Sequence, residues 1–348
     1  MNKTKRWAGG FLLAISLFAA GCSQASTQSA GSEPQGGESG AAVTSGAEIK
    51  LGFNPWPGYF PFFIAEEKGI FEKYGLNVDV VLFPVLSDQL TAVSGGQLDV
   101  SGVTVNDLVV PLSKGVDLRA VGVVDISDGG DALVAHKSIV SLDQLKGKRI
   151  ATELGTVDHL LMMVGLEQAG LGESDIQFTN MSMNDAGPAL LSGSLDAASL
   201  YEPFVSMATT GGEHHVLFSS ADVPGLIADL LVVKGEMADE RPEDVKNMLH
   251  AWYDALEYWK ANPEESLEIM AEAADLPVEE FAGVYDGIKM FTVDESIQAF
   301  EKGDDYGSLY FTAEKTVEFL KGLEFMDSDP DLDASFDPSF LEAIKAER

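Results

Sequence analysis

The chain has a single cysteine, few basic residues and no apolar run long enough to cross a membrane. One cysteine, Cys22, excludes an intramolecular disulfide, so an apolar core must hold the fold. The 22 basic residues against 56 acidic ones give a formal net charge of -34. Nucleic acid and anionic membrane surfaces attract positive potential, so neither is expected as a partner. The acidity by itself is typical of a solvated surface and does not identify a ligand.

Motifs for catalysis and for metal binding are also missing. The sequence contains no Ser-His-Asp set, no phosphate-binding loop and no spaced pair of metal ligands. We therefore predict no catalytic residue, no metal site and no cofactor. These absences favour a binding protein over an enzyme.

The N-terminus has the pattern of a processed export signal. A basic start is followed by an apolar run of about 15 residues from Trp7, short of the roughly 20 needed to span a bilayer. The run ends at Ala19-Ala20-Gly21, directly before Cys22. This arrangement resembles a bacterial lipoprotein signal, in which the cysteine is acylated after cleavage. We predict a signal peptide at 1–21 and lipid attachment at Cys22, which place the protein outside the cytoplasm with the lipid as its membrane contact.

A low-complexity segment follows the cysteine. Residues 22–48 are rich in Ser, Gly, Ala, Gln and Glu and contain no aromatic residue, so they cannot bury a core. As a flexible coil this linker would reach roughly 25–30 Å. It is expected to hold a globular body close to the membrane.

The remaining 300 or so residues follow a repeated β-α order. The first half has strand patterns at 49–54, 78–84, 98–103 and 118–124, and the order restarts with strand patterns at 148–153, 175–180, 195–200 and 215–220. SGGQLDVSG at 94–102 is echoed by LSGSLDAAS at 191–199. We predict an α/β fold with two lobes, each a mostly parallel sheet with flanking helices.

The last third is expected to be helical. Apolar spacings of three and four predict helices at 242–261, 263–274 and 277–290, and Trp252 recurs at core spacing within the first of them. With no further sheet to cover, these helices should pack on the first lobe. The predicted division is lobe 1 at 49–130, lobe 2 at 131–230, and a return to lobe 1 with the C-terminal tail at 231–348.

Four sequence stretches resemble a known family of binding proteins. GFNPWPGYFPFFIAEEKGIFEKYGLNVDVV, LKGKRIATELGTVDHLLM, SLDAASLYEPFVS and PGLIADLLVV are similar to segments of NMT1/THI5-like solute-binding proteins of the nitrate, sulfonate and taurine class of ABC importers. The resemblance implies a type II periplasmic-binding fold with crossovers near 125–135 and 225–235. It also implies a small-molecule solute, an ABC permease and ATPase complex as partner, and a monomer.

Turns after the predicted strands supply the candidate site. Ligands gather at the carboxyl ends of parallel strands, where helix N-termini present free N–H groups. After the first strand, Trp56 and Tyr59 offer flat walls with polar handles, or else they plug the end of the lobe. In the second lobe Gly155, Thr156 and Val157 could cradle an oxyanion, with His159 beside them.

Carboxylates qualify the expectation of an anion site. Asp158 places a negative charge in the same turn, and Glu202, Asp131 and Asp229 lie near the other strand ends and crossovers. Each could equally cap a helix or shape a hinge turn. Together they favour a ligand with a cationic amine, such as taurine, over bare nitrate or sulfate.

Two alternatives to this function remain open. One is a binding protein for a planar nitrogenous solute, such as a thiamine-precursor pyrimidine, held between an aromatic residue and a carboxylate. The other is an enzyme on the same fold, since the pyrimidine synthases of thiamine biosynthesis resemble this family. Those enzymes use a cysteine-rich motif that this chain lacks.

Overall fold

The computed structural model describes residues 45–348, which form two lobes, each built on one β-sheet. The predicted signal peptide, the lipid-attachment cysteine Cys22 and nearly all of the linker lie outside the described residues. None of the described helices has the length and apolar character needed to cross a bilayer.

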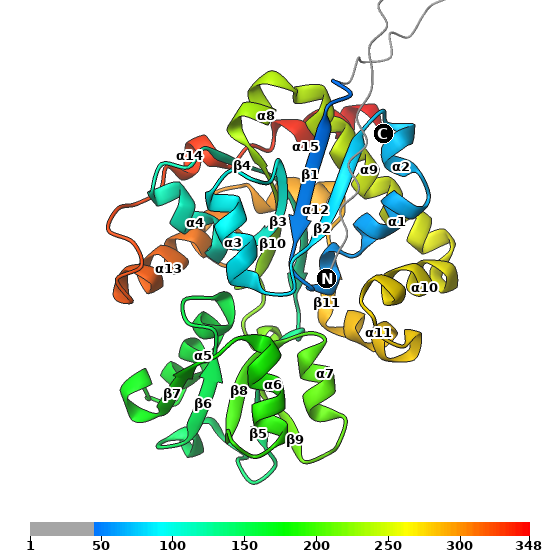
Figure 1. The fold of residues 1–348 in the computed structure, drawn as a ribbon. Coiled ribbons are helices and arrows are strands. Elements are labelled where there is room, and N and C mark those ends of the chain that lie inside the picture. Colours follow the sequence, from blue (N-terminus) through cyan, green and yellow to red (C-terminus); the bar gives the residue numbers. More distant parts are fainter. Residues whose placement is uncertain (1–44) are drawn as a thin grey trace, which may run out of the picture. The chain divides into compact units, whose positions relative to one another are not determined.

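The first lobe contains a six-stranded sheet in the order β11-β4-β10-β3-β1-β2 (Figure 1). Its strands are β1 (Glu48–Phe53), β2 (Asn77–Leu82), β3 (Val100–Thr104), β4 (Leu118–Ser127), β10 (Ala228–Lys234) and β11 (Ile288–Met290). The second lobe contains a five-stranded sheet in the order β7-β6-β8-β5-β9. Its strands are β5 (Asp131–His136), β6 (Arg149–Thr152), β7 (Gln177–Asn180), β8 (Ala197–Tyr201) and β9 (His214–Ser219).

The sequence echo corresponds to equivalent places in the two sheets. In each lobe the echoed segment leads from a helix into a strand, β3 or β8, which pairs in parallel with the first strand of that lobe's parallel unit, β1 or β6. The preceding helices are α3 (Leu86–Ser94) and α6 (Met183–Leu191). The internal similarity therefore reflects two copies of one β-α-β-α-β arrangement.

Most strands of each sheet run in the same direction, as predicted, but each sheet also contains antiparallel strand pairs. Strands β1, β2 and β3 are parallel to one another, but β10 pairs antiparallel with both β3 and β4. In the second sheet β5 likewise pairs antiparallel with β8 and β9. The reason is that β5 and β10 each enter a lobe directly from a crossover and not through a β-α-β connection, so nothing obliges them to run parallel.

Helices surround each sheet. Those of the first lobe before the crossover are η1 (Pro57–Tyr59), α1 (Pro61–Glu67), α2 (Ile70–Lys73), α3 and α4 (Val105–Ser113). Those of the second lobe are η2 (Leu142–Leu145), α5 (Val157–Gln168), η3 (Glu173–Asp175), α6, α7 (Phe204–Thr209) and η4 (Ser220–Asp222).

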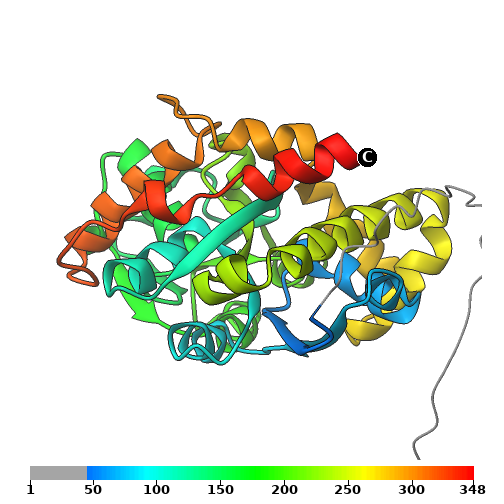
Figure 2. The same cartoon turned by 90° about the horizontal axis from the view of Figure 1, so that it is seen from above.

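The C-terminal helices return to the first lobe, as predicted. They are α8 (Gly235–Glu240), α9 (Pro242–Ala261), α10 (Pro263–Ala273), α11 (Val278–Val284), η5 (Tyr285–Gly287), α12 (Val293–Ala299), α13 (Leu309–Gly322), α14 (Leu332–Ser335) and α15 (Ser339–Glu347). Helices α9, α15 and α12 lie side by side (Figure 2). The buried Trp252 of α9 packs on Phe62 of α1 with ring centroids 4.6 Å apart, which confirms its core assignment.

The predicted helix at 277–290 is wrong in its second half. Helix α11 ends at Val284, and the chain then forms η5 and the short strand β11, whose Ile288 pairs with Ser127 of β4. The carbonyl of Gly287 accepts backbone hydrogen bonds from Asp128 and Gly130 of the first crossover. These long-range bonds compete successfully with the local helical pattern.

The two crossovers are joined by serine hydroxyls. Ser127 Oγ lies 2.7 Å from Ser220 Oγ, and Ser220 Oγ also accepts from the N–H of Gly129 at 2.7 Å. Ser127 Oγ accepts from the N–H of Asp131 at 2.9 Å. The start of β5 is thereby fixed relative to the end of β9.

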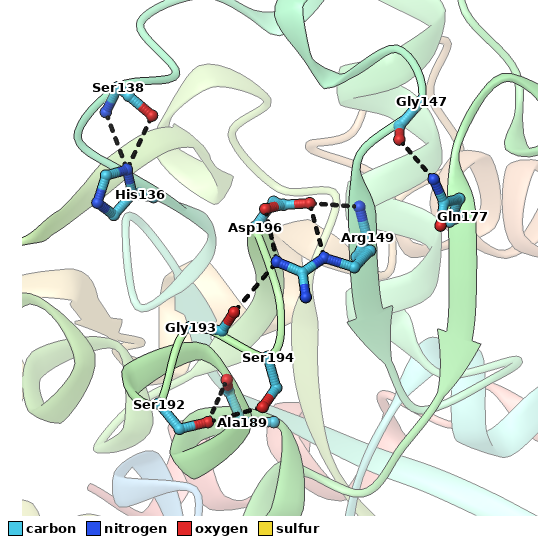
Figure 3. Close-up of polar contacts among 10 residues, drawn as sticks. All are labelled: His136, Ser138, Gly147, Arg149, Gln177, Ala189, Ser192, Gly193, Ser194 and Asp196. Carbon is cyan, nitrogen blue, oxygen red and sulfur yellow. Dashed lines mark hydrogen bonds and ion pairs between the residues drawn. The ribbon is translucent and has the colours of Figure 1, made fainter.

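An ion pair fixes the end of the second sheet where β6 begins (Figure 3). Arg149 donates two side-chain hydrogen bonds to Asp196, at 3.1 and 2.9 Å, and its N–H donates to the same carboxylate. Gln177 at the start of β7 donates to the carbonyl of Gly147. The opposite ends of β6 and β8 are left for the turns that carry the candidate site.

Candidate functional site

A small cavity of about 20 Å³ lies between the lobes, at the carboxyl ends of the parallel strands. Asn54 directly follows β1, Thr104 is the last residue of β3, and Tyr201 is the last residue of β8. The volume is enough for one or two small atoms or groups, so a larger ligand requires the lobes to separate further. The lining residues are Asn54, Trp56, Leu86, Thr104, Asp107, Asp131, Val157, Asp158, Tyr201, Ile227 and Asp229.

Trp56 forms one wall of the cavity and is only 4% exposed. Its Nε1 donates to Asp125 Oδ1 at 3.0 Å, and its ring meets Tyr201 of the other lobe edge-on at 6.3 Å. A Cβ on Gly58 would lie 2.1 Å from Asp125 Oδ2, so only glycine lets this loop approach the carboxylate so closely. The turn thus brings an aromatic wall from the first lobe against the second.

Four aspartates supply most of the polar lining. Asp107 and Asp229 come from the first lobe, and Asp131 and Asp158 from the second. All are at most 5% exposed. Both carboxyl oxygens of Asp158, and one oxygen each of Asp107 and Asp131, have no hydrogen-bond partner. Buried carboxyl oxygens are normally satisfied, and here a proton shared between Asp131 and Asp158 can serve the unpartnered oxygens of that pair until a ligand replaces it.

The strand register places further acidic groups beside them. Asp229 of β10 is paired with Asp125 of β4 on one side and with Thr104 of β3 on the other. The Tyr59 hydroxyl donates to Asp229 Oδ1 at 2.5 Å. Tyr59 therefore lies behind the carboxylates and holds Asp229 in position from beneath the cavity.

Burial and mutual repulsion raise the pKa of these carboxyls. Desolvation raises the pKa of Asp125 to about 8, with a further increase from Asp131, while the bond from Trp56 opposes the rise. Desolvation likewise raises the pKa of Asp131 to about 7. The pKa values of Asp158 and Asp229 are raised well above their usual range, first by burial and then by Asp131 and Asp125 respectively. At neutral pH the cluster therefore holds protons until an opposing charge replaces them.

The turn before α5 is capped as expected, but its imidazole faces away from the cavity. Thr156 accepts from the N–H of His159 at 3.4 Å, and Gly155 has a φ of +81°. His159 Nδ1 accepts from the N–H of Gly155, so Nε2 carries the proton that is donated to Glu173 at 2.9 Å. The ring stacks on Phe178 at 4.9 Å, and burial lowers the pKa of His159. His159 thus supports the turn from behind.

Glu202 also serves a local structural contact. Its two carboxyl oxygens accept from the N–H and the hydroxyl of Ser206, at 3.1 and 2.8 Å. Its own N–H donates to the carbonyl of Gly130 in the first crossover. Glu202 is 7% exposed and does not line the cavity.

The structure brings four of the nine candidate ligand-binding residues to the cavity surface. Trp56, Asp131, Val157 and Asp229 line it, whereas Tyr59, Gly155, Thr156, His159 and Glu202 do not. The candidate set did not include Asp107, Asp158, Thr104 or Tyr201, which also line it. Asp107 could have been found because it opens the helix after β3, the same strand-to-helix position as the turns that were singled out.

Several direct contacts join the lobes around the cavity. Asn106 Nδ2 donates to the carbonyl of Gly155 at 2.8 Å, and Asn184 Nδ2 donates to the carbonyl of Pro84 at 3.0 Å. Leu86 lines the cavity, and the next residue, Ser87, lines a wider, open hollow of about 870 Å³. That hollow also includes Glu153 and Asp185.

Comparison with known proteins gives the family. The pattern of the NMT1/THI5-like family matches residues 56–266, more than half of the chain. The chain belongs to the NMT1/THI5-like family. The matched range contains both crossovers and every cavity-lining residue except Asn54.

Individual family relatives are binding proteins by name. A binding protein of Brucella abortus (strain 2308) is 29% identical over 277 residues, covering 74% of this chain and 81% of that protein. The taurine-binding periplasmic protein of Escherichia coli K12 is 25% identical, covering 65% and 73%. The solved structure of the E. coli periplasmic aliphatic sulphonate binding protein SsuA superposes with a TM-score of 0.71 at 20% identity, covering 82% and 91%. This last likeness establishes the two-lobed binding-protein fold.

Proposed function

We propose that the protein is the extracytoplasmic solute-binding component of an ABC importer. The observation that carries the proposal is the cavity between the lobes, with an aromatic wall from Trp56 and unpartnered carboxyl oxygens from both sides. Such a cavity suits a small solute that is captured as the lobes close and is then delivered to a permease and its ATPase. The family's binding-protein relatives support this role.

Binding without catalysis fits the groups in the cleft. Among the residues that the structure describes, the cavity lining contains no serine or cysteine nucleophile and no histidine. The protein is therefore proposed to hold its solute unchanged.

The solute is proposed to be a small amine-bearing compound of the sulfonate or taurine type. The sulfonate part of the proposal is supported by the taurine-binding relative, and the amine part by the four aspartates that line the cavity. A second candidate is a planar nitrogenous solute such as a thiamine-precursor pyrimidine. It is favoured by the pairing of aromatic walls, Trp56 and Tyr201, with carboxylates in one cavity.

A thermal-shift screen tests the proposal. The panel contains taurine, alkanesulfonates, nitrate, bicarbonate, amino acids and pyrimidines. Stabilisation by taurine supports the first candidate, and stabilisation by pyrimidines alone supports the second. Trp56→Ala should abolish the shift with either solute, since the indole forms a wall of the cavity. Stabilisation that persists unchanged in Trp56→Ala would place the solute elsewhere.

Membrane attachment through Cys22 is part of the same proposal. A lipid on Cys22 and a linker at 22–48 would keep the lobes near the permease and raise their effective concentration there. Cys22→Ser is expected to release the protein from the membrane fraction of expressing cells, while the neighbouring Ser26→Ala is not. Membrane association of both variants would contradict the lipoprotein assignment.

A further inference from the structure

The polar lining of the cavity has one sign of charge on both lobes. Asp107 and Asp229 face it from the first lobe, and Asp131 and Asp158 from the second. Within the described part of the chain, no Lys, Arg or His lines the cavity. We infer that the cavity is a subsite for a positively charged nitrogen, so that the solute is an organic cation, or a zwitterion that enters with its cationic end first. This inference rests on the proposed use of the cleft as the solute site.

The free carboxyl oxygens are the first support for this inference. Asp158 is fully buried, yet neither of its oxygens has a partner, and Asp107 Oδ1 and Asp131 Oδ2 are also unpartnered. An ionised carboxylate accepts hydrogen bonds and donates none, so a ligand that displaces the protons held by these aspartates must bring donors of its own. An ammonium or amidinium group offers several N–H donors and the opposite charge.

A sulfonate or nitrate group would be repelled by the aspartates and could not donate hydrogen bonds to them. Its oxygens accept hydrogen bonds, as do the aspartate oxygens, and like charges in a site of low dielectric repel strongly. The lining residues with neutral side-chain donors are Asn54, Trp56, Thr104 and Tyr201, and two of these donors are already used, by Trp56 toward Asp125 and by Thr104 toward Asp107. An anion could enter only while the carboxyls keep all the protons that they hold at neutral pH, or take up more. The acidic end of a zwitterion is therefore expected to point away from the four aspartates.

The aromatic walls fit the same kind of ligand. Trp56 and Tyr201 meet at the cavity from opposite lobes. Aromatic faces attract cations, and the attraction is strongest where water is excluded. Buried aromatic rings beside carboxylates are thus suited to a methylated or protonated nitrogen.

The division of the aspartates between the lobes gives the cation a role in closure. With all four ionised, the two acidic faces would repel each other across the cleft. A cation between them contacts both faces at once and converts the repulsion into attraction. The ligand charge would then drive closure directly, in addition to the hydrogen bonds of Asn106 and Asn184 that join the lobes.

Titration calorimetry with four matched probes tests the inference. Choline and an aminomethylpyrimidine are cations, taurine is a zwitterion, and isethionate is taurine with a hydroxyl in place of the amine. Binding of at least one ammonium compound, with taurine at least about tenfold tighter than isethionate, supports the inference. It is overturned if isethionate binds as tightly as taurine, or if all three nitrogen compounds fail to bind.

A charge variant with a matched control gives a second test. Asp158→Asn keeps the shape but cannot ionise when a cation binds, and should weaken the tightest ammonium probe roughly 10- to 100-fold. The asparagine amide can donate to Asp131 as the protonated carboxyl does, so the variant should remain folded. Asp143→Asn, at an exposed carboxylate of η2 that lines neither the cavity nor the wider hollow, changes the net charge equally and should leave affinity within about twofold. Equal affinities of Asp158→Asn and the unchanged protein would refute the subsite.

Failure of the transport proposal would look different. Solution X-ray scattering of the protein saturated with a bound probe measures whether the lobes close. A cation that binds without reducing the radius of gyration would contradict the role in solute delivery while leaving the charge preference intact. An anion that binds and closes the lobes would contradict the charge preference alone.

Discussion

Replacing Asp125 with asparagine should stabilise the protein at alkaline pH and leave it nearly unchanged in acid. Asp125 is fully buried, Trp56 donates to its Oδ1, and its Oδ2 has no partner. An asparagine carbonyl can accept the same bond from Trp56. The substitution therefore removes one ionisable group from the cluster and keeps its main contact.

The direction of the pH effect follows from the raised pKa of Asp125. Burial raises this pKa to about 8, with further electrostatic increase from Asp131, whereas the unfolded chain has the ordinary value near 3.8. Between these pH values the folded protein holds a proton that the unfolded chain has lost, so the free energy of unfolding falls as pH rises. The loss extends through the folded pKa. The other titratable groups that face the cluster are Asp229, Tyr59 and Tyr285, and all are acidic.

The size of the effect can be bounded from the same quantities. One pKa unit corresponds to about 1.4 kcal/mol, and we expect the removal of this ionisation to raise the free energy of unfolding at pH 8 by about 1.4–3 kcal/mol. For a body of this size, that is a rise in Tm of about 3–6 °C in Asp125→Asn relative to the unchanged protein. Near pH 4 the two proteins should melt within about 1 °C of each other.

Thermal unfolding followed by circular dichroism at pH 4, 6 and 8 measures this difference. The matched control is Asp196→Asn on the surface of the second lobe, where Arg149 lowers the pKa of the carboxylate. Asp196→Asn should be less stable than the unchanged protein above about pH 4, because the substitution removes a carboxylate that is ionised there and paired with Arg149. If the Tm difference between Asp125→Asn and the unchanged protein is the same at pH 8 as at pH 4, the folded protein does not pay a free-energy cost for ionising Asp125 and the reasoning fails.

Three further substitutions test contacts of the cleft. Tyr59→Phe removes the hydroxyl that donates to Asp229 and should destabilise the protein by about 1–3 kcal/mol in urea unfolding at pH 6, whereas an unchanged midpoint would contradict the hydrogen bond. Gly58→Ala places a methyl 2.1 Å from Asp125 Oδ2 and should weaken solute binding at least about tenfold by displacing Trp56. The control Gly211→Ala, whose added methyl meets nothing within 4 Å, should bind the solute normally. Equal binding by both variants would contradict this role of Gly58. Asn184→Ala removes the inter-lobe hydrogen bond to the carbonyl of Pro84 and should increase the radius of gyration of the solute-free protein, measured by X-ray scattering. An unchanged radius would argue that this bond does not hold the lobes together.

The fold could be predicted largely because its signals are local. Strand patterns ending in small-residue turns, and the echo between 94–102 and 191–199, are enough to indicate two β-α units from the sequence. Antiparallel insertion of β5 and β10 was missed, because strand direction depends on the connection through the crossover and not on the strand's own residues. The end of α11 was missed for a related reason, since bonds from the first crossover to Gly287 decide it.

The candidate site shows the same division. Trp56, Asp131, Val157 and Asp229 could be found as residues next to strand ends, and all four line the cavity. The sequence could not show which way a side chain in such a turn points. His159, for example, lies in the expected turn but bonds to Glu173 behind it. Pairing between Asp229 and Asp125 across two strands was likewise visible only in the sheet register.

The proton exchange on solute binding tests the cationic cleft most directly. Calorimetry of one bound solute in two buffers of different ionisation enthalpy gives the number and sign of protons exchanged. A cation that replaces protons among Asp125, Asp131, Asp158 and Asp229 should release about one proton per solute near pH 7, because their pKa values are raised in the free protein. Uptake of protons on binding would mean that the carboxyls must be neutralised to admit an anion, and would contradict the account.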